Sequence, residues 1–94
     1  MPMFSIATTN RFEKDVARCY KRGLDIDKME TLIECLENTG TVLLKPYRPH
    51  TLTGKFLGHW ECHIKPDWLL LWLRDDDQKT ITLIGTGTHS DLFK

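Results

Sequence analysis

Residues 68 to 73 consist only of tryptophan and leucine, in the order Trp-Leu-Leu-Leu-Trp-Leu. A strand points successive side chains to opposite faces, so a run that is apolar at every position is typical of a strand buried on both faces. Two further strand patterns, over residues 59–65 and 79–85, flank this run, and short segments of turn-forming residues separate the three. The sequence therefore predicts an antiparallel meander with residues 68–74 as its central strand.

The first half of the chain predicts one strand and two helices. Residues 3–8 alternate loosely and favour a strand. Residues 11–22 and the segment after Asp27 carry apolar side chains at helical spacing, and each follows a capping residue with an acid three positions on. We therefore expect an α+β fold with an N-terminal strand and a two-helix hairpin packed on the antiparallel sheet, in a single domain over residues 1–94.

Composition limits the class of protein. With 40% hydrophobic and 28% charged residues, the chain resembles a folded domain, and no apolar run approaches the roughly 20 residues of a membrane span. The N-terminal residues lack a basic start before an apolar stretch, so we expect no signal peptide and a cytoplasmic location. The formal net charge is zero, so any nucleic-acid surface must be local. The three cysteines match no zinc or redox spacing and are expected to be reduced.

Residues with useful chemistry gather around a long loop. Residues 41–58 contain two prolines and two glycines, with apolar side chains that can hold the loop in place. Strand alternation puts Glu61 and His63 together on the exposed face of their strand, opposite the apolar positions. His50 in the loop, Asp67 at the following turn and His89 beyond the last strand can converge on that face.

Each of these residues also has a structural interpretation. His50 and His63 can be ordinary loop and strand residues, Asp67 can bond its own turn, and His89 can cap a helical turn. Two histidines four apart on a strand, His59 and His63, are roughly 13 Å apart, which is too far for one zinc ion, so we expect no metal site. Histidines and carboxylates without a nucleophile motif suit general acid–base chemistry near neutral pH, and they leave the substrate open.

Three segments resemble the YafQ branch of the RelE-type bacterial toxins, which are ribosome-dependent mRNA interferases of type II toxin–antitoxin systems. The segments are His50-x-Leu52-x-Gly54 with Gly58, His63-Ile-x-Pro66-Asp67-Trp68-Leu-Leu, and Gly87-Thr-His89-Ser-Asp-Leu-Phe93. The resemblance extends over essentially the whole chain. It implies the RelE-like fold, and it implies cleavage of mRNA in the ribosomal A site by attack of a ribose 2′-OH on the adjacent phosphodiester, with no metal and no cofactor.

The resemblance also implies roles for individual residues. His50, His63, Asp67 and His89 form an acid–base cluster, and Phe93 positions the substrate base. In this hypothesis His89 is the general acid, His50 or Asp67 is the general base, and His63 assists orientation. The other expected substrate-binding residues are Glu61, Arg48, Lys55 and Lys65.

One position departs from the family pattern. Relatives often carry an arginine where this chain has Gly85, and the loss of a phosphate-binding guanidinium favours a non-catalytic binding module with the toxin fold. A ribosome-independent ribonuclease is a further alternative. The implied partners are a cognate antitoxin, the ribosome with its mRNA, and operator DNA only through the antitoxin, with no membrane.

Overall fold

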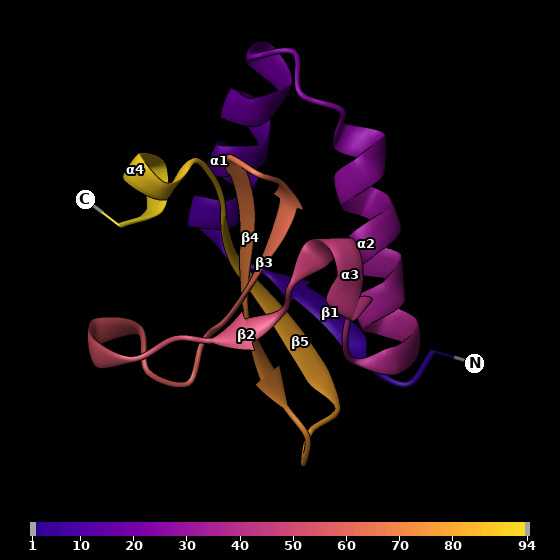
Figure 1. The fold of residues 1–94 in the computed structure, drawn as a ribbon. Coiled ribbons are helices and arrows are strands. Elements are labelled where there is room, and N and C mark those ends of the chain that lie inside the picture. Colours follow the sequence, from indigo (N-terminus) through magenta and orange to yellow (C-terminus); the bar gives the residue numbers. More distant parts are fainter. Residues whose placement is uncertain (1, 94) are drawn as a thin grey trace.

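The computed structural model describes residues 2–93 and has the predicted α+β arrangement (Figure 1). A five-stranded sheet has the order β1-β5-β4-β3-β2. β3, β4 and β5 form the predicted antiparallel meander, with β4 at the centre, and β1 joins the sheet parallel to β5. The strands are β1 (Ser5–Thr8), β2 (His50–Thr51), β3 (Trp60–Lys65), β4 (Trp68–Asp75) and β5 (Thr80–Gly87).

Both N-terminal helices are present, with two differences in capping. The Thr9 hydroxyl, one of the two predicted caps, accepts from the Phe12 amide, whereas Asn10, predicted to cap with Glu13 three positions on, is the first residue of the helix. The second helix is capped by Asp25 instead of the predicted Asp27, because starting at Ile26 adds another apolar side chain to the face that packs on the core. The helical segments are α1 (Asn10–Lys21), α2 (Ile26–Thr39), α3 (Leu44–Tyr47), the 3-10 turn η1 (Gly54–Phe56) and α4 (His89–Leu92).

The main core lies between the sheet and the N-terminal helices. Alternate β4 side chains, Leu70 and Trp72, point into it, and Trp72 stacks on Trp60 of β3 with ring centroids 6.3 Å apart. Each fully buried leucine contributes about 1.5–3 kcal/mol of hydrophobic free energy. The apolar seam of the helices is therefore covered by the sheet, as the sequence predicts.

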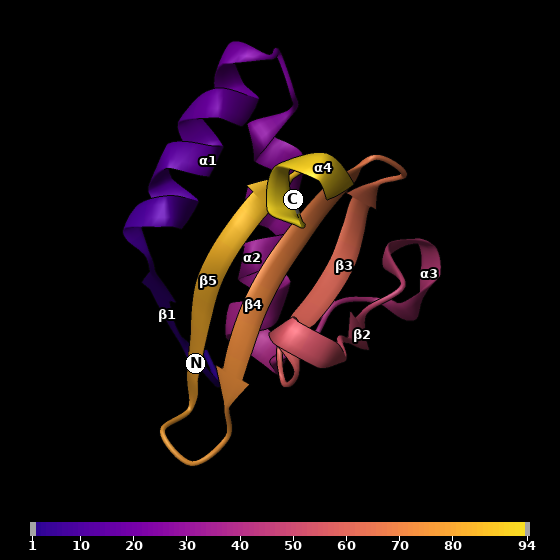
Figure 2. The same cartoon turned by 90° about the vertical axis from the view of Figure 1, so that its left-hand side faces the viewer.

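The opposite face of the sheet carries a smaller apolar cluster. Leu69 and Leu71 of β4 alternate with the core residues, yet they are also buried, as is Leu92 of α4. Figure 2 shows α4 crossing this face, while α2 lies behind the sheet. The apolar run of β4 is thus explained by cover on both sides, and α4 provides part of the second cover.

The long loop is ordered by secondary structure of its own. It contains α3, η1 and the short strand β2, which pairs with β3 and extends the sheet. Tyr47, Leu52 and Phe56 are half-buried, as predicted, but the Leu57 side chain is 73% exposed and does not hold the loop. Figure 1 shows the part of the loop after β2 and α4 on the same side of the sheet, away from α2, whereas α3 lies beside α2.

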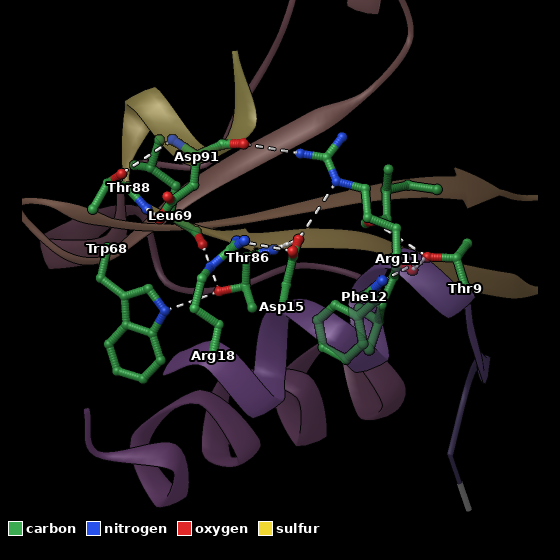
Figure 3. A network of polar contacts seen from close by, with 12 residues as sticks. Thr9, Arg11, Phe12, Asp15, Arg18, Trp68, Leu69, Thr86, Thr88 and Asp91 are labelled. Carbon is green, nitrogen blue, oxygen red and sulfur yellow. Dashed lines mark hydrogen bonds and ion pairs between the residues drawn. The ribbon is translucent and has the colours of Figure 1, made fainter. Parts of the chain in front are cut away.

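The edge of β5 is completed by α1 where β1 ends. β1 pairs with β5 as far as Leu83, and the Thr9 amide then donates to the Leu83 carbonyl at 3.2 Å. Further along, Asp15 Oδ2 accepts from the Thr86 amide at 3.1 Å (Figure 3). The Asp15 side chain is buried, and Arg18 pairs with it at 2.8 Å. A helix carboxylate therefore takes the place of a neighbouring strand at the C-terminal end of β5.

No helix within residues 2–93 is long and apolar enough to cross a membrane. The three cysteines are unpaired within the described part of the chain; Cys19 and Cys62 are buried and Cys35 is half-buried.

Candidate active site

A hollow of about 370 Å³ lies on the sheet face that α4 covers. The long loop supplies one wall of the hollow and α4 supplies another. Phe93, which follows α4, also lines the hollow. Its lining brings four of the predicted site residues together with three that were not predicted to belong to the site. The lining residues are His50, Leu52, Thr53, Phe56, Glu61, His89 and Phe93, and we call this site the aromatic hollow.

His50 is held at both ring nitrogens. β2 pairs with β3 so that His50 lies opposite Glu61, and paired residues point to the same face. His50 Nε2 lies 3.2 Å from Glu61 Oε1, and His50 Nδ1 lies 2.9 Å from the Arg48 carbonyl oxygen. Both neighbours are hydrogen-bond acceptors, so the protonated imidazole ring satisfies both of them at once.

Glu61 is buried, which differs from the expectation of an exposed face. Strand alternation correctly predicts that Glu61 and His63 share a face, but the loop and α4 fold over it and leave Glu61 only 6% exposed. A buried carboxylate requires a partner, and His50 provides one. Alternation alone could not reveal this cover, because residues distant in sequence supply it.

His89 and Phe93 reach the hollow through the fold of α4. The Thr88 hydroxyl and the Asp91 carboxylate form a capping box that fixes the start of this short helix. The Phe93 ring lies 4.8 Å from the His89 ring and meets the Phe56 ring edge-on at 5.1 Å. Contact between Phe56 and Phe93 therefore joins the loop to the C-terminal segment and bounds the hollow.

His63 lies beside the aromatic hollow. Its ring centroid is 6.2 Å from that of His50, and its Nδ1 is 3.4 Å from the Pro66 carbonyl oxygen. It lines a second hollow of about 310 Å³, which also contains two of the expected substrate-binding residues. The lining residues there are Lys28, Pro46, Arg48, His63, Ile64, Lys65 and Pro66, and we call this site the basic hollow.

Asp67 and Lys55 lie apart from the histidines. Asp67 is exposed at the turn between β3 and β4, where it lines a third hollow together with Lys65 and Arg22. Its carboxylate makes no hydrogen bond or ion pair with any residue between 2 and 93, so the turn bond expected for it is not observed. Lys55 is exposed on η1.

Neighbouring side chains fill the space beside the Cα atom of Gly85. A Cβ atom at Gly85 would lie 3.0 Å from Asp15 Oδ2 and 3.0 Å from Leu92 Cδ2. Arg11 Nε would be 3.6 Å away, and this guanidinium also donates to the Asp91 carbonyl at 3.2 Å (Figure 3). An arginine at position 85 would displace contacts that join α1, β5 and α4.

Charge around the site is fixed by ion pairs. The Arg22 guanidinium, which pairs with Asp91 at 2.6 Å, holds the pKa of that carboxyl far below its usual range, and the Thr88 amide adds to the effect. Burial, with the Glu61 carboxylate nearby, raises the pKa of the Cys62 thiol to about 12, so this thiol is no nucleophile at neutral pH. Within residues 2–93, no three histidine, cysteine or acidic side chains are grouped to hold a metal ion.

Comparison with known proteins gives one consistent result. Residues 4–94 match the family described as the bacterial toxin of type II toxin–antitoxin systems, YafQ. The mRNA interferase toxin YafQ of Escherichia coli K12 is 34% identical over 88 residues, which span 94% of this chain and 94% of that protein.

Solved structures agree with the sequence match. The E. coli DinJ–YafQ toxin–antitoxin complex contains a chain with a TM-score of 0.87 and 33% identity, covering 98% of this chain and 99% of that one. A metal-bound toxin from Helicobacter pylori gives a TM-score of 0.86 at 33% identity, covering 97% of this chain and all of that one. Sequence, fold and chain length all agree, and this chain belongs to the YafQ family of type II toxin–antitoxin toxins.

Proposed function

We propose that this toxin is a ribosome-dependent endoribonuclease that cleaves mRNA by internal attack of a ribose 2′-OH. The observation that carries the proposal is the aromatic hollow, where His50 and His89 line one space together with two phenylalanine rings. The name of the E. coli relative, mRNA interferase toxin, supports the choice of RNA as substrate. Two histidines beside flat apolar rings suit proton transfer at a nucleotide whose base is held by stacking.

The His50–Glu61 pair acts as the general base in this proposal. In the neutral ring Nδ1 donates to the Arg48 carbonyl, and a 2′-OH that enters between Nε2 and Glu61 gives its proton to Nε2, which leaves an imidazolium beside the Glu61 carboxylate. The pair therefore stabilises the state that follows proton uptake, as a carboxylate beside a catalytic histidine does in other enzymes. Asp67, the other expected base, is exposed in a different hollow, so its position favours a role in contacts with flanking substrate.

His89 acts as the general acid. It is exposed at the start of α4 and can be reprotonated from solvent between turnovers. As the 2′-oxygen bonds to phosphorus, the bond from phosphorus to the 5′-oxygen breaks, and that oxygen takes the His89 proton. The products are a 2′,3′-cyclic phosphate and a free 5′-OH. Because the nucleophile belongs to the RNA, no metal-activated water is required.

The proposed partners follow from the family. A relative forms a complex with the antitoxin DinJ, and we propose a cognate antitoxin for this toxin, with operator DNA reached only through it. The proposed reaction takes place in the cytoplasm, on mRNA held by a translating ribosome.

The test is primer extension on a reporter mRNA with and without translating ribosomes. The wild-type toxin should cut within the reading frame only when ribosomes are present, and His50→Gln or His89→Gln should slow cutting about 10²–10⁴-fold. Ser90→Ala, at an exposed position beside His89, is the matched control. Cuts in naked RNA would indicate a ribosome-independent ribonuclease, and no cuts in either reaction would indicate a non-catalytic binding module.

Metal independence needs a separate control, because ribosomes themselves require magnesium. Toxin that has been stripped with a chelator and added to a reaction containing Mg²⁺ as its only divalent ion should cut as fast as untreated toxin. Activity that returns only when a transition metal is added would contradict this part of the proposal.

A further inference from the structure

We propose that the basic hollow is a phosphate subsite, which binds the RNA backbone one step away from the scissile phosphodiester. The inference rests on the proposed function and adds a binding site to it. The basic hollow has a volume of about 310 Å³, and its charged and titratable lining residues are Lys28, Arg48, His63 and Lys65. The adjacent His63 and His50 rings lie between it and the aromatic hollow.

The two hollows are lined by side chains of opposite charge. The basic hollow is lined by three cationic side chains and no acid, whereas the aromatic hollow is lined by Glu61 and no lysine or arginine. Three cations around one small space repel one another, and a bound phosphate would relieve that repulsion. The aromatic hollow offers rings for an uncharged nucleobase beside the two reacting histidines, and the basic hollow suits a further phosphate.

The cations of the basic hollow are also free of ion pairs. Among residues 2–93, no carboxylate lies within ion-pair distance of Lys28, Arg48 or Lys65. Four other arginines are each paired with an aspartate: Arg11, Arg18, Arg22 and Arg74. Lys28, Arg48 and Lys65 are thus three of the cations without an ion pair in the part of the chain that the structure describes, and they converge on a single hollow.

Three separate elements bring these cations together. Lys28 lies in the first turn of α2, Arg48 follows α3, and Lys65 ends β3 next to an irregularity in the pairing with β4. Arg48 has a φ of +47°, a left-handed conformation that costs free energy for any residue with a Cβ. The Arg48 carbonyl accepts the hydrogen bond of His50 Nδ1, so the Arg48 backbone orients the His50 ring while the Arg48 side chain lines the basic hollow.

Binding of a non-cleavable RNA tests the subsite without relying on catalysis. The probe is a fluorescent oligoribonucleotide with a 2′-deoxy sugar at the cleavage position, and anisotropy is measured over a range of salt concentrations. Lys28→Gln/Lys65→Gln should weaken binding about tenfold, and the slope of log K against log salt should fall by about 0.7 for one lost phosphate contact. Lys14→Gln/Lys79→Gln removes the same charge elsewhere and should change affinity less than twofold.

Replacing single linkages of the probe with uncharged methylphosphonate identifies the phosphate. Wild-type toxin should lose about tenfold in affinity at one linkage beside the scissile one, and Lys28→Gln/Lys65→Gln should lose nothing further there. Lys28→Arg/Lys65→Arg should bind like wild type, which excludes a loss caused by misfolding. Additive losses, or equal losses in the Lys14→Gln/Lys79→Gln control, would overturn the subsite.

Two further outcomes separate this inference from the proposed function. If wild-type toxin cuts ribosome-bound mRNA and Lys28→Gln/Lys65→Gln binds and cuts equally well, the subsite is wrong while the proposed function stands. If wild-type toxin never cuts but RNA binding depends on the two lysines, the proposed function fails and the subsite stands. Loss of affinity for the cognate antitoxin, with RNA binding intact, would assign the hollow to the antitoxin and overturn the proposal.

Discussion

Glu61 is the residue on which the proposed base depends most. Its carboxylate is buried and lies 3.2 Å from His50 Nε2, so it stabilises the imidazolium that forms when His50 takes a proton. Glu61→Gln keeps the shape and removes the charge. We expect the cleavage rate in ribosome complexes to fall about 10–100-fold, because charge stabilisation of this kind contributes a few kcal/mol.

Single-turnover cleavage measures this loss separately from substrate binding. Glu61→Asp, which keeps the carboxylate and shortens the side chain by one methylene, should retain more activity than Glu61→Gln. Equal rates for wild type and Glu61→Gln would show that His50 works without a charged partner.

Gly85 is explained by packing at the residue scale. A Cβ atom there would press against Asp15 Oδ2 and Leu92 Cδ2, and Asp15 is fixed by its bond to the Thr86 amide. We expect Gly85→Ala to lower the free energy of unfolding by about 1–3 kcal/mol, as overpacking does in other cores. Urea unfolding measures the change, with Ser90→Ala as an exposed control. Unchanged stability would show that the neighbouring side chains yield freely.

At the scale of elements, α4 is held by one carboxylate. Asp91 accepts from the Thr88 amide at 2.8 Å and pairs with Arg22 at 2.6 Å, so it joins the short helix to the end of α1. His89 and Phe93 stand at the two ends of this helix. The position of both side chains in the aromatic hollow therefore depends on the Asp91 contacts.

Acid should weaken this attachment. The pKa of Asp91 is held below its usual range in the folded chain, mainly by Arg22, whereas an unfolded aspartate titrates near pH 3.9. The stabilisation is thus complete above about pH 4 and is lost as the pH falls toward the folded pKa. Asp91→Asn should lower the free energy of unfolding at pH 7, and the difference from wild type should shrink at pH 3. A difference that does not change with pH would contradict this account.

The sequence predicts elements better than it predicts the site. The apolar run of β4 and the Thr9 cap are local patterns, and both correspond to observed structure. The burial of Glu61 and the roles of Phe56 and Lys28 depend on contacts between segments far apart in the sequence, which no local pattern records. Motifs shared with the family identified His50, His89 and Phe93, and the structure places these three in one hollow.

At the scale of the whole molecule, the net charge is zero, but paired and unpaired charged side chains lie in different regions. Asp15, paired with Arg11 and Arg18, joins α1 to β5, and Arg22 pairs with Asp91 of α4. Lys28, Arg48 and Lys65, which have no ion pair within residues 2–93, meet beside His63. Figure 1 shows α4 and the part of the loop after β2 on one side of the sheet, while α2 covers the other. The face away from α2 thus carries the aromatic hollow, whereas the basic hollow also includes Lys28 of α2.

The central claim is that the RNA supplies its own nucleophile within the aromatic hollow. A single 2′-deoxy nucleotide placed immediately 5′ of a mapped cut, in mRNA bound to ribosomes, tests this claim most directly. We predict that cutting at that site is abolished while cuts at unmodified sites continue at the wild-type rate. Continued cutting at the 2′-deoxy site would show that water is the nucleophile and would contradict the account.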